Sequence, residues 1–112
     1  MQPTAGNRPP LYSTLAADPD LSELVDLFVA EMPERIAAIE LLAHGRNWDQ
    51  LSQIAHQLKG AAGGYGFPDI TRCASQLEAT IGGGQPEPIA VALEQLLGLC
   101  RRARSRAAQS GP

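Results

Sequence analysis

The sequence predicts an all-α fold, an antiparallel up-down four-helix bundle with a short N-terminal extension or helix. Three observations lead to this prediction. Hydrophobic residues make up 44% of the chain but aromatic residues only 4%, a composition that favours packed helices over a sheet. Apolar residues recur at spacings of three and four in four segments, and no segment alternates as a strand does. Glycine and proline separate the segments, so each helix needs the others to bury its apolar stripe.

The length of 112 residues is that of one domain with one modest core. Residues 1–10 are rich in proline and contain little apolar area, so we expect a disordered lead there. We expect the bundle over residues 11–106 and a flexible tail over residues 107–112. Leu11 and Leu15 form a short apolar patch ahead of the first helix.

The first helix is expected to start at Asp18, which is followed by a proline and a second acid, as at many helix N-termini. Its stripe keeps its phase across Pro33, which favours one helix kinked at Pro33 over two separate helices. We expect it to end at His44, with Gly45 in the left-handed conformation. The stripe is Leu21, Leu24, Val25, Phe28, Met32, Ile36, Ile39 and Ala43.

The second helix follows a capping-box pattern, Asn47 with Gln50 three residues later, and ends at glycines between residues 63 and 66. Proline at position 68 begins the third helix and the glycines at 82–84 end it. The fourth begins near residues 86–88 and fades into alanine and arginine. Their inward residues are Trp48, Leu51, Ile54, Ala55, Leu58, Ala62, Ile70, Cys73, Ala74, Leu77, Ile81, Ile89, Leu93, Leu96, Leu97 and Cys100.

Charge is unevenly distributed along the chain. All 12 acidic residues precede position 100, where only five basic residues accompany them, so the body is strongly negative and is expected to repel nucleic acid. The basic tail consists of Arg101, Arg102, Arg104 and Arg106. We interpret it as complementing the dipole of the last helix, with an electrostatic contact to an acidic partner as the alternative.

We expect a cytoplasmic protein with reduced thiols. The N-terminus lacks the pattern of an export signal, and no run of 18 apolar residues predicts a membrane span. Cys73 and Cys100 have no CxxC spacing and lie at apolar helix positions, where a free thiol behaves as a small hydrophobic group.

His56 is the candidate functional residue. On a helical wheel with Leu51 directed to the core, His56 lies about 140° away and Gly60 about 180° away, so both face solvent. Glycine within a helix costs about 1 kcal/mol relative to alanine, which indicates that another molecule approaches the backbone at Gly60. Lys59 lies one turn after the histidine and supplies a positive charge beside it.

This combination suits phosphoryl transfer. A neutral imidazole is a good nucleophile near pH 7 and a good leaving group once phosphorylated. Lys59 would screen the phosphoryl charge, and Gly60 would allow in-line approach of a partner. Partner contacts are assigned to Gln53, Gln57, Gly63 and Gly64. The sequence has no phosphate-binding loop and no acidic pair for magnesium, so we expect no cofactor of its own and no unaided use of ATP.

The stretch HQLKGAA, residues 56–62, with Gly66 ten residues after the histidine, resembles the signature of the histidine-containing phosphotransfer (HPt) domain. FVAEMPER, residues 28–35, and Leu77-Glu78 resemble the flanking helices of that family, so the resemblance covers about residues 11–104. KGAAGGYGF is also similar to the phosphorylated domain of chemotaxis-type histidine kinases. With no kinase or dimerisation segment following here, we favour a free-standing carrier.

The resemblance implies a phosphocarrier of a two-component phosphorelay that is not itself an enzyme. His56 would be phosphorylated on the imidazole nitrogen farther from the backbone. The partners would be a response-regulator receiver domain, which supplies an aspartate and Mg²⁺, and a hybrid or other histidine kinase. The family's third helix offers a polar residue toward the site, here Gln76 or Glu78. We expect a monomer.

Three alternatives remain open. In the first, the chain is a helical docking module that binds a receiver or kinase domain, and His56 has no role in its function. A metal site would need His44, His56 and a cysteine to converge, although the cysteines point to the core and His56 to solvent. An independent enzyme would need a second catalytic group or a cleft, of which the sequence gives no sign. Phe28 and Trp48 are interpreted as packing residues, and Tyr65 and Phe67 either contact a partner or cover the bundle end.

Overall fold

The structure is a computed structural model that describes residues 9–105. The expected lead, except residues 9 and 10, and the expected tail lie outside the described residues. Within them the prediction of a helical fold is confirmed, with five helices where four were expected. In chain order the elements are β1 (Leu11–Tyr12), α1 (Ser22–Ala30), α2 (Met32–His44), α3 (Trp48–Gly64), α4 (Pro68–Gly83), α5 (Pro86–Arg102) and β2 (Ala103–Arg104).

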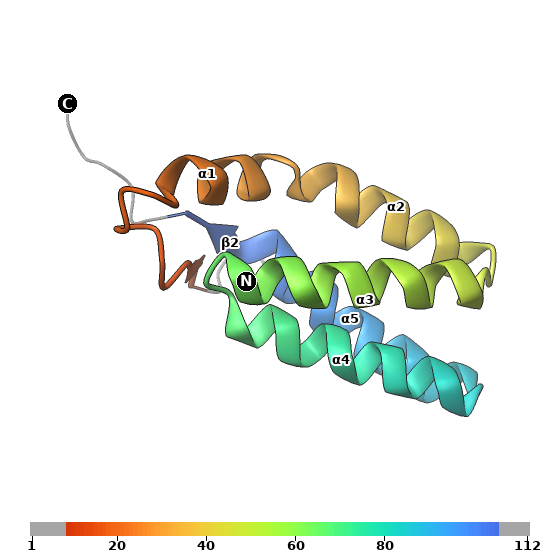
Figure 1. The fold of residues 1–112 in the computed structure, drawn as a ribbon. Coiled ribbons are helices and arrows are strands. Elements are labelled where there is room, and N and C mark those ends of the chain that lie inside the picture. The colour runs from red at the N-terminus through yellow and green to blue at the C-terminus, as the bar shows by residue number, and fades with distance from the viewer. Residues whose placement is uncertain (1–8, 106–112) are drawn as a thin grey trace, which may run out of the picture.

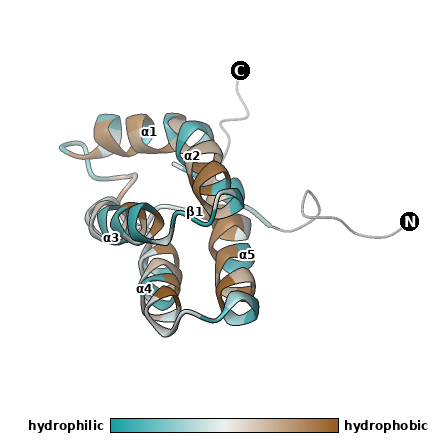
Figure 2. Cartoon of the chain, turned by 90° about the vertical axis from the view of Figure 1, so that its right-hand side faces the viewer, coloured by the Kyte–Doolittle hydropathy of each residue, from teal (hydrophilic) through white to brown (hydrophobic). Residues whose placement is uncertain are grey.

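The first expected helix is divided into α1 and α2, so the prediction of one kinked helix is wrong. Glu31 separates the two, and Pro33 is the second residue of α2. In the first turn of a helix the N–H groups have no partner within the helix, so proline, which has no N–H, is tolerated there. In a continuous helix its ring would clash with the carbonyl four residues earlier. The interruption therefore falls just before the proline, and Figure 2 shows α1 turned away from the axis of α2.

The start of α1 also differs from the prediction. The helix begins at Ser22, and Asp18 lies in a turn before it, where its carboxylate accepts the Asp20 N–H at 2.9 Å. The expected stripe does not face the core throughout. Leu24 was expected inside and is 45% exposed, and Leu27 is 55% exposed.

Helices α2 to α5 follow one another in alternating directions, with α3 and α4 side by side (Figures 1 and 2). The most extensive helix pairing is between α3 and α4. The core between the helices is apolar and includes nearly all the inward residues expected for α3, α4 and α5. The largest fully buried side chains are Phe67, Ile39, Leu51, Leu58, Ile70, Leu77, Ile89, Leu96, Val25 and Cys100.

Two helix-end predictions are wrong in detail. Gly45 has a φ of −84°, and the left-handed residue is its neighbour Arg46, with a φ of 56°. Asn47 immediately precedes α3 but its side chain forms no capping hydrogen bond. The triple glycine behaves as expected, because α4 ends at Gly83 and Gly84 is left-handed with a φ of 75°.

Two short strands, which the sequence pattern did not predict, join the ends of the described chain. β1 pairs in parallel with β2, with Leu11 opposite Ala103. Residues 13–15, which follow β1 and which we call the N-terminal strap, cross the loop between α3 and α4. In the strap Ser13 Oγ donates to the Tyr65 carbonyl at 2.6 Å and the Thr14 N–H donates to the Gly66 carbonyl at 2.8 Å.

Gly66 is required by this crossing. Its φ is +88°, a backbone conformation that residues with a side chain rarely adopt. A Cβ at this position would lie 2.5 Å from Ser13 Oγ and 2.8 Å from the Thr14 nitrogen. Beneath the strap, the Phe28 ring packs on the rings of Tyr65 and Phe67, at centroid distances of 5.4 and 5.7 Å. The bundle is therefore closed at this end.

Candidate functional site

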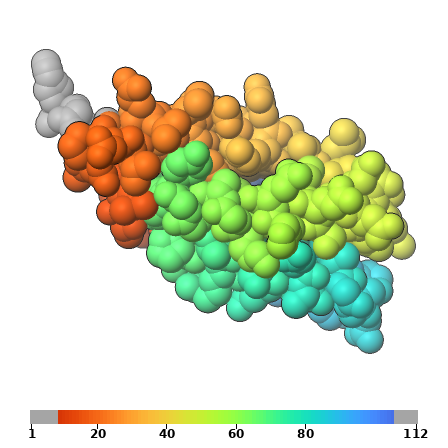
Figure 3. Space-filling view, in the orientation of Figure 1, coloured from red at the N-terminus to blue at the C-terminus, as the bar shows by residue number. Residues whose placement is uncertain are grey.

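His56 lies on the outer face of α3, as the helical wheel predicts. Its side chain is 66% exposed, whereas the neighbours Ala55 and Leu58 are buried in the core. The same periodicity that buries the apolar residues of α3 therefore presents the imidazole to solvent. The space-filling view shows the surface of α3, in green, running along one face of the molecule with α4 beside it (Figure 3). Any chemistry at His56 is open to a second macromolecule.

Glu78 of α4 connects His56 with Lys59. One carboxylate oxygen lies 3.0 Å from His56 Nδ1, and the other accepts a hydrogen bond from Lys59 Nζ at 3.0 Å. Glu78 is 27% exposed and Lys59 is 33% exposed, so the bridge lies partly between the helices. We call His56, Lys59 and Glu78 the His56 site.

Electrostatics assigns the hydrogen on the imidazole. The hydrogen bond from Lys59 is the largest of the effects that hold the pKa of Glu78 below its ordinary value. Desolvation opposes it, and the Lys59 charge and the contact with His56 add smaller contributions to the lowering. An ionised carboxylate only accepts hydrogen bonds, so Nδ1 carries the hydrogen in this contact. When the imidazole is neutral, Nε2 is then the nitrogen with the free lone pair.

The helix surface beyond His56 carries little side-chain material. A Cβ on Gly60 or on Gly64 would meet nothing within 4 Å. The fold therefore does not need glycine at either position for packing, and the bare backbone is available to a partner. Gly63 differs, because a Cβ there would lie 3.3 Å from Thr71 Oγ1 on α4.

His56 also lines a shallow hollow of about 250 Å³ together with Ser52, Gln53, Gln57 and Glu78. The two glutamines assigned to partner contacts thus lie in the same hollow as the histidine. Besides His56, the only ionisable side chain in the lining is that of Glu78, and its charge is paired with that of Lys59. The lining of the hollow around the imidazole therefore carries little unpaired charge.

Of the two candidates on α4, Glu78 reaches the site and Gln76 does not. Gln76 lies about 160° around the helix from Glu78 and lines a different hollow, with residues of α5. The Lys59 ammonium, which was expected to supply a positive charge beside the histidine, is paired with Glu78. The sequence contained the signal for Glu78 only as a family resemblance, since spacing within one helix does not show which residue faces a neighbouring helix.

Other residues that the sequence singled out lie elsewhere. Phe67 is fully buried and Tyr65 is half-buried. Both rings cover the end of the bundle together with the ring of Phe28, on which they pack. Burial raises the pKa of Cys73, and raises that of Cys100 to about 12. In residues 9–105 no three potential metal-binding side chains among His, Cys, Asp and Glu are grouped together.

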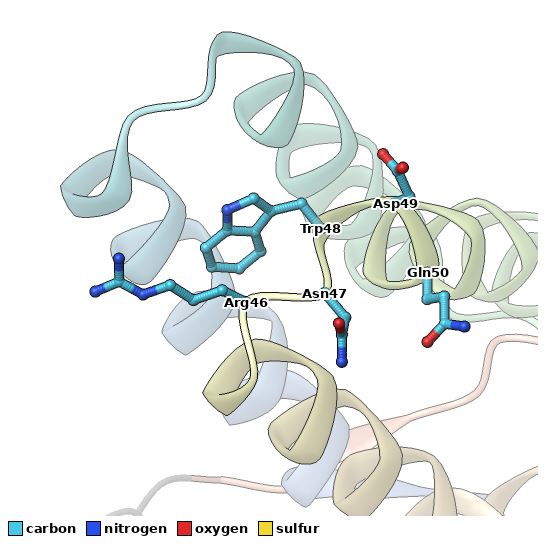
Figure 4. A pocket seen from close by; sticks show the side chains of 5 residues that line it. All are labelled: Arg46, Asn47, Trp48, Asp49 and Gln50. Atoms are coloured by element: carbon cyan, nitrogen blue, oxygen red, sulfur yellow. The ribbon is translucent and has the colours of Figure 1, made fainter.

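A larger hollow, of about 510 Å³, lies at the loop between α2 and α3 and is lined by residues 46–50. Figure 4 shows the Arg46 side chain and the Trp48 ring on the same side of this loop, with Asp49 pointing away from them. None of the lining residues belongs to the His56 site. The hollow is at the end of the bundle opposite the N-terminal strap (Figure 1).

The arginines after residue 100 are largely engaged within the fold. Arg101 pairs with Glu40 of α2, and Arg104 donates to the carbonyl of Ala103 at 2.8 Å. Arg106 lies outside the described residues. Within the described part of the chain, no helix combines the length and apolar character needed to cross a membrane.

Comparison with known proteins identifies one family. The family model of the Hpt domain matches residues 23–106 of the chain. The matched span includes all three residues of the His56 site and begins in the first turn of α1. No curated protein and no solved structure matches the chain.

Proposed function

The chain belongs to the Hpt domain family, the phosphocarrier modules of phosphorelays, and from this premise we propose that His56 is the residue that carries the phosphoryl group. The group is accepted from an aspartyl phosphate of a receiver domain, or from a kinase, and passed to another receiver. The observation that supports this proposal best is the Glu78 contact at 3.0 Å, which holds hydrogen on Nδ1 and leaves the exposed Nε2 as the nucleophile.

The transfer step follows from this arrangement. The Nε2 lone pair attacks phosphorus, and as the N–P bond forms, the bond between phosphorus and the receiver's carboxylate oxygen breaks with its electron pair remaining on that oxygen. The ring then carries a positive charge, which the Glu78 carboxylate stabilises through Nδ1–H. In the reverse direction the N–P bond breaks and the lone pair returns to Nε2. No proton has to enter or leave the ring in either direction.

Lys59 and Gly60 have separate roles in this proposal. The Lys59 ammonium, which is held 3.0 Å from the Glu78 carboxylate that also contacts the imidazole, is proposed to turn toward the phosphoryl oxygens and offset their charge. The open surface at Gly60 lets the receiver's loops approach in line with the N–P bond. Gln53 and Gln57, in the same hollow, offer uncharged hydrogen-bonding groups to the partner.

The receiver supplies the remaining chemistry. This chain provides the imidazole and its two charged neighbours, and the partner is proposed to bring the aspartate and the Mg²⁺ that shields the phosphoryl group in transit. We propose that the chain works as a monomeric carrier in the cytoplasm without a cofactor of its own.

The test is phosphoryl transfer from a phosphorylated receiver domain in the presence of Mg²⁺, with His56→Gln as the comparison. We expect the wild-type protein to acquire label that is labile to acid and stable to alkali, and the variant to acquire none. If a panel of receivers from the same cell binds the wild-type protein but transfers nothing, the protein is a docking module instead. If it neither binds nor transfers, the proposal is wrong.

A further inference from the structure

Helix α4 contacts Lys59 through both its side chain and its backbone. Its ammonium donates to Glu78, and its backbone carbonyl accepts a hydrogen bond from Thr71 Oγ1 at 2.9 Å. Thr71 precedes Glu78 by seven residues, two turns of α4, so both side chains lie on the same face of that helix. Two contacts from one helix face therefore meet the same residue of α3.

The Thr71 contact depends on a glycine. Thr71 Oγ1 lies only 3.3 Å from the position of a Cβ on Gly63, closer than most such contacts. A side chain at residue 63 would press on the hydroxyl that binds the Lys59 carbonyl. This gives Gly63 a role within the fold, unlike Gly60 and Gly64, whose surroundings are open.

From these contacts we propose that Thr71, in contact with Gly63, is a positioning residue that sets how α4 lies along α3 and so brings Glu78 to His56 Nδ1. The contacts of Ala74 and Leu77 in the core are apolar and therefore carry no directional requirement of their own. The Thr71 hydrogen bond is directional, and a shift of about one ångström lengthens it beyond its normal range. This inference rests on the proposed function for its biological meaning but not for its test.

The test removes the hydroxyl with Thr71→Val, which keeps the size and the branching of the side chain. Thr80→Val is the matched control, because Thr80 lies on the same helix and its Oγ1 donates to a carbonyl of α4 itself, that of Gln76, at 2.6 Å. The primary readout is the tautomer of His56, measured from the ¹⁵N shifts of its two ring nitrogens in labelled protein. A general loss of stability does not by itself move this readout.

We expect Thr71→Val to lower the ratio of the Nδ1–H to the Nε2–H tautomer about fivefold, the factor that corresponds to one ordinary hydrogen bond. Thr71→Ser should restore the wild-type ratio, and Thr80→Val should leave it unchanged. Gly63→Ala keeps the hydroxyl but crowds it, and should shift the ratio in the same direction. It also serves as the test if Thr71→Val does not fold.

The proposal is overturned if Thr71→Val and Gly63→Ala both give the wild-type ratio, or if Thr80→Val shifts it as far as they do. Transfer from a phosphorylated receiver is measured on the same proteins, and its rate should fall with the tautomer ratio. Failure of the wild-type protein to accept phosphate would refute the proposed function, while the tautomer comparison would still decide the role of Thr71.

Discussion

Gly60→Ala separates the stability of α3 from its function. The added methyl group enters open space, since within the described residues, apart from the adjacent backbone of α3 itself, no atom lies within 4 Å of the position that a Cβ would occupy. Alanine is favoured over glycine inside a helix by about 1 kcal/mol, so the variant should be more stable by that amount. For a domain of this size the gain corresponds to about 5 °C in Tm.

The same methyl group should impair transfer. It projects from the exposed face one turn beyond His56, where the receiver is proposed to approach the backbone. A single misplaced methyl group in a close-fitting contact costs about 1–3 kcal/mol, so we expect the transfer rate to fall at least about tenfold. The assay is rapid-quench transfer from a phosphorylated receiver, with thermal unfolding followed by circular dichroism on the same samples.

Gly98→Ala is the control for helix propensity. Gly60 and Gly98 are each the thirteenth residue of a helix of 17 residues, and neither Cβ would have a neighbour within 4 Å. Gly98→Ala should gain the same stability and transfer at the wild-type rate. Wild-type transfer by Gly60→Ala would refute the reasoning about close approach, and equal losses in both variants would assign the effect to helix rigidity.

Three further predictions concern other parts of the fold. Glu78→Gln should lower the free energy of unfolding at pH 7, and the difference from the wild-type protein should disappear as the pH falls below about 4.5. The reason is that the pKa of Glu78 is lowered in the folded state, so its ion pair stabilises the fold only while the carboxylate is ionised. An equal difference at pH 3 in urea unfolding would contradict this. Above pH 9, the free energy of unfolding of the wild-type protein should fall by up to about 1.4 kcal/mol per pH unit relative to that of Cys100→Ala. The Cys100 thiol ionises near pH 9 in the unfolded chain, whereas its pKa is about 12 in the folded protein. Parallel pH profiles of the two proteins would show that Cys100 does not affect stability in this way. Gly66→Ala should lose about 2–4 kcal/mol in urea unfolding from its positive φ and its overlap with the N-terminal strap, and a loss below about 1 kcal/mol would show that the strap moves aside freely.

The features that depend on one helix at a time were predictable from the sequence. The exposure of His56 and the burial of Leu51 and Leu58 follow from helical periodicity alone. The glycine stops after α3 and α4 were also predictable, because a glycine such as Gly84 adopts a backbone conformation that other residues avoid.

The features that depend on two elements were not predictable in this way. The bridge from Glu78 to His56 and Lys59 requires the position of α4 along α3, which no spacing within either helix contains. The exposure of Leu24 was missed because apolar spacing alone does not show which part of α1 has another element packed on it. The two-residue strands are too short to produce an alternating pattern, and they pair segments from opposite ends of the described chain.

The parallel pairing of Leu11 with Ala103 has a consequence for the order in which the molecule assembles. It closes a loop that contains nearly the whole described chain, and such a contact carries a larger entropic penalty than the local turns between successive helices. The helical hairpin of α3 and α4 needs only its own short loop and contains the complete His56 site. The contacts of the His56 site therefore do not require the two ends of the described chain to have met.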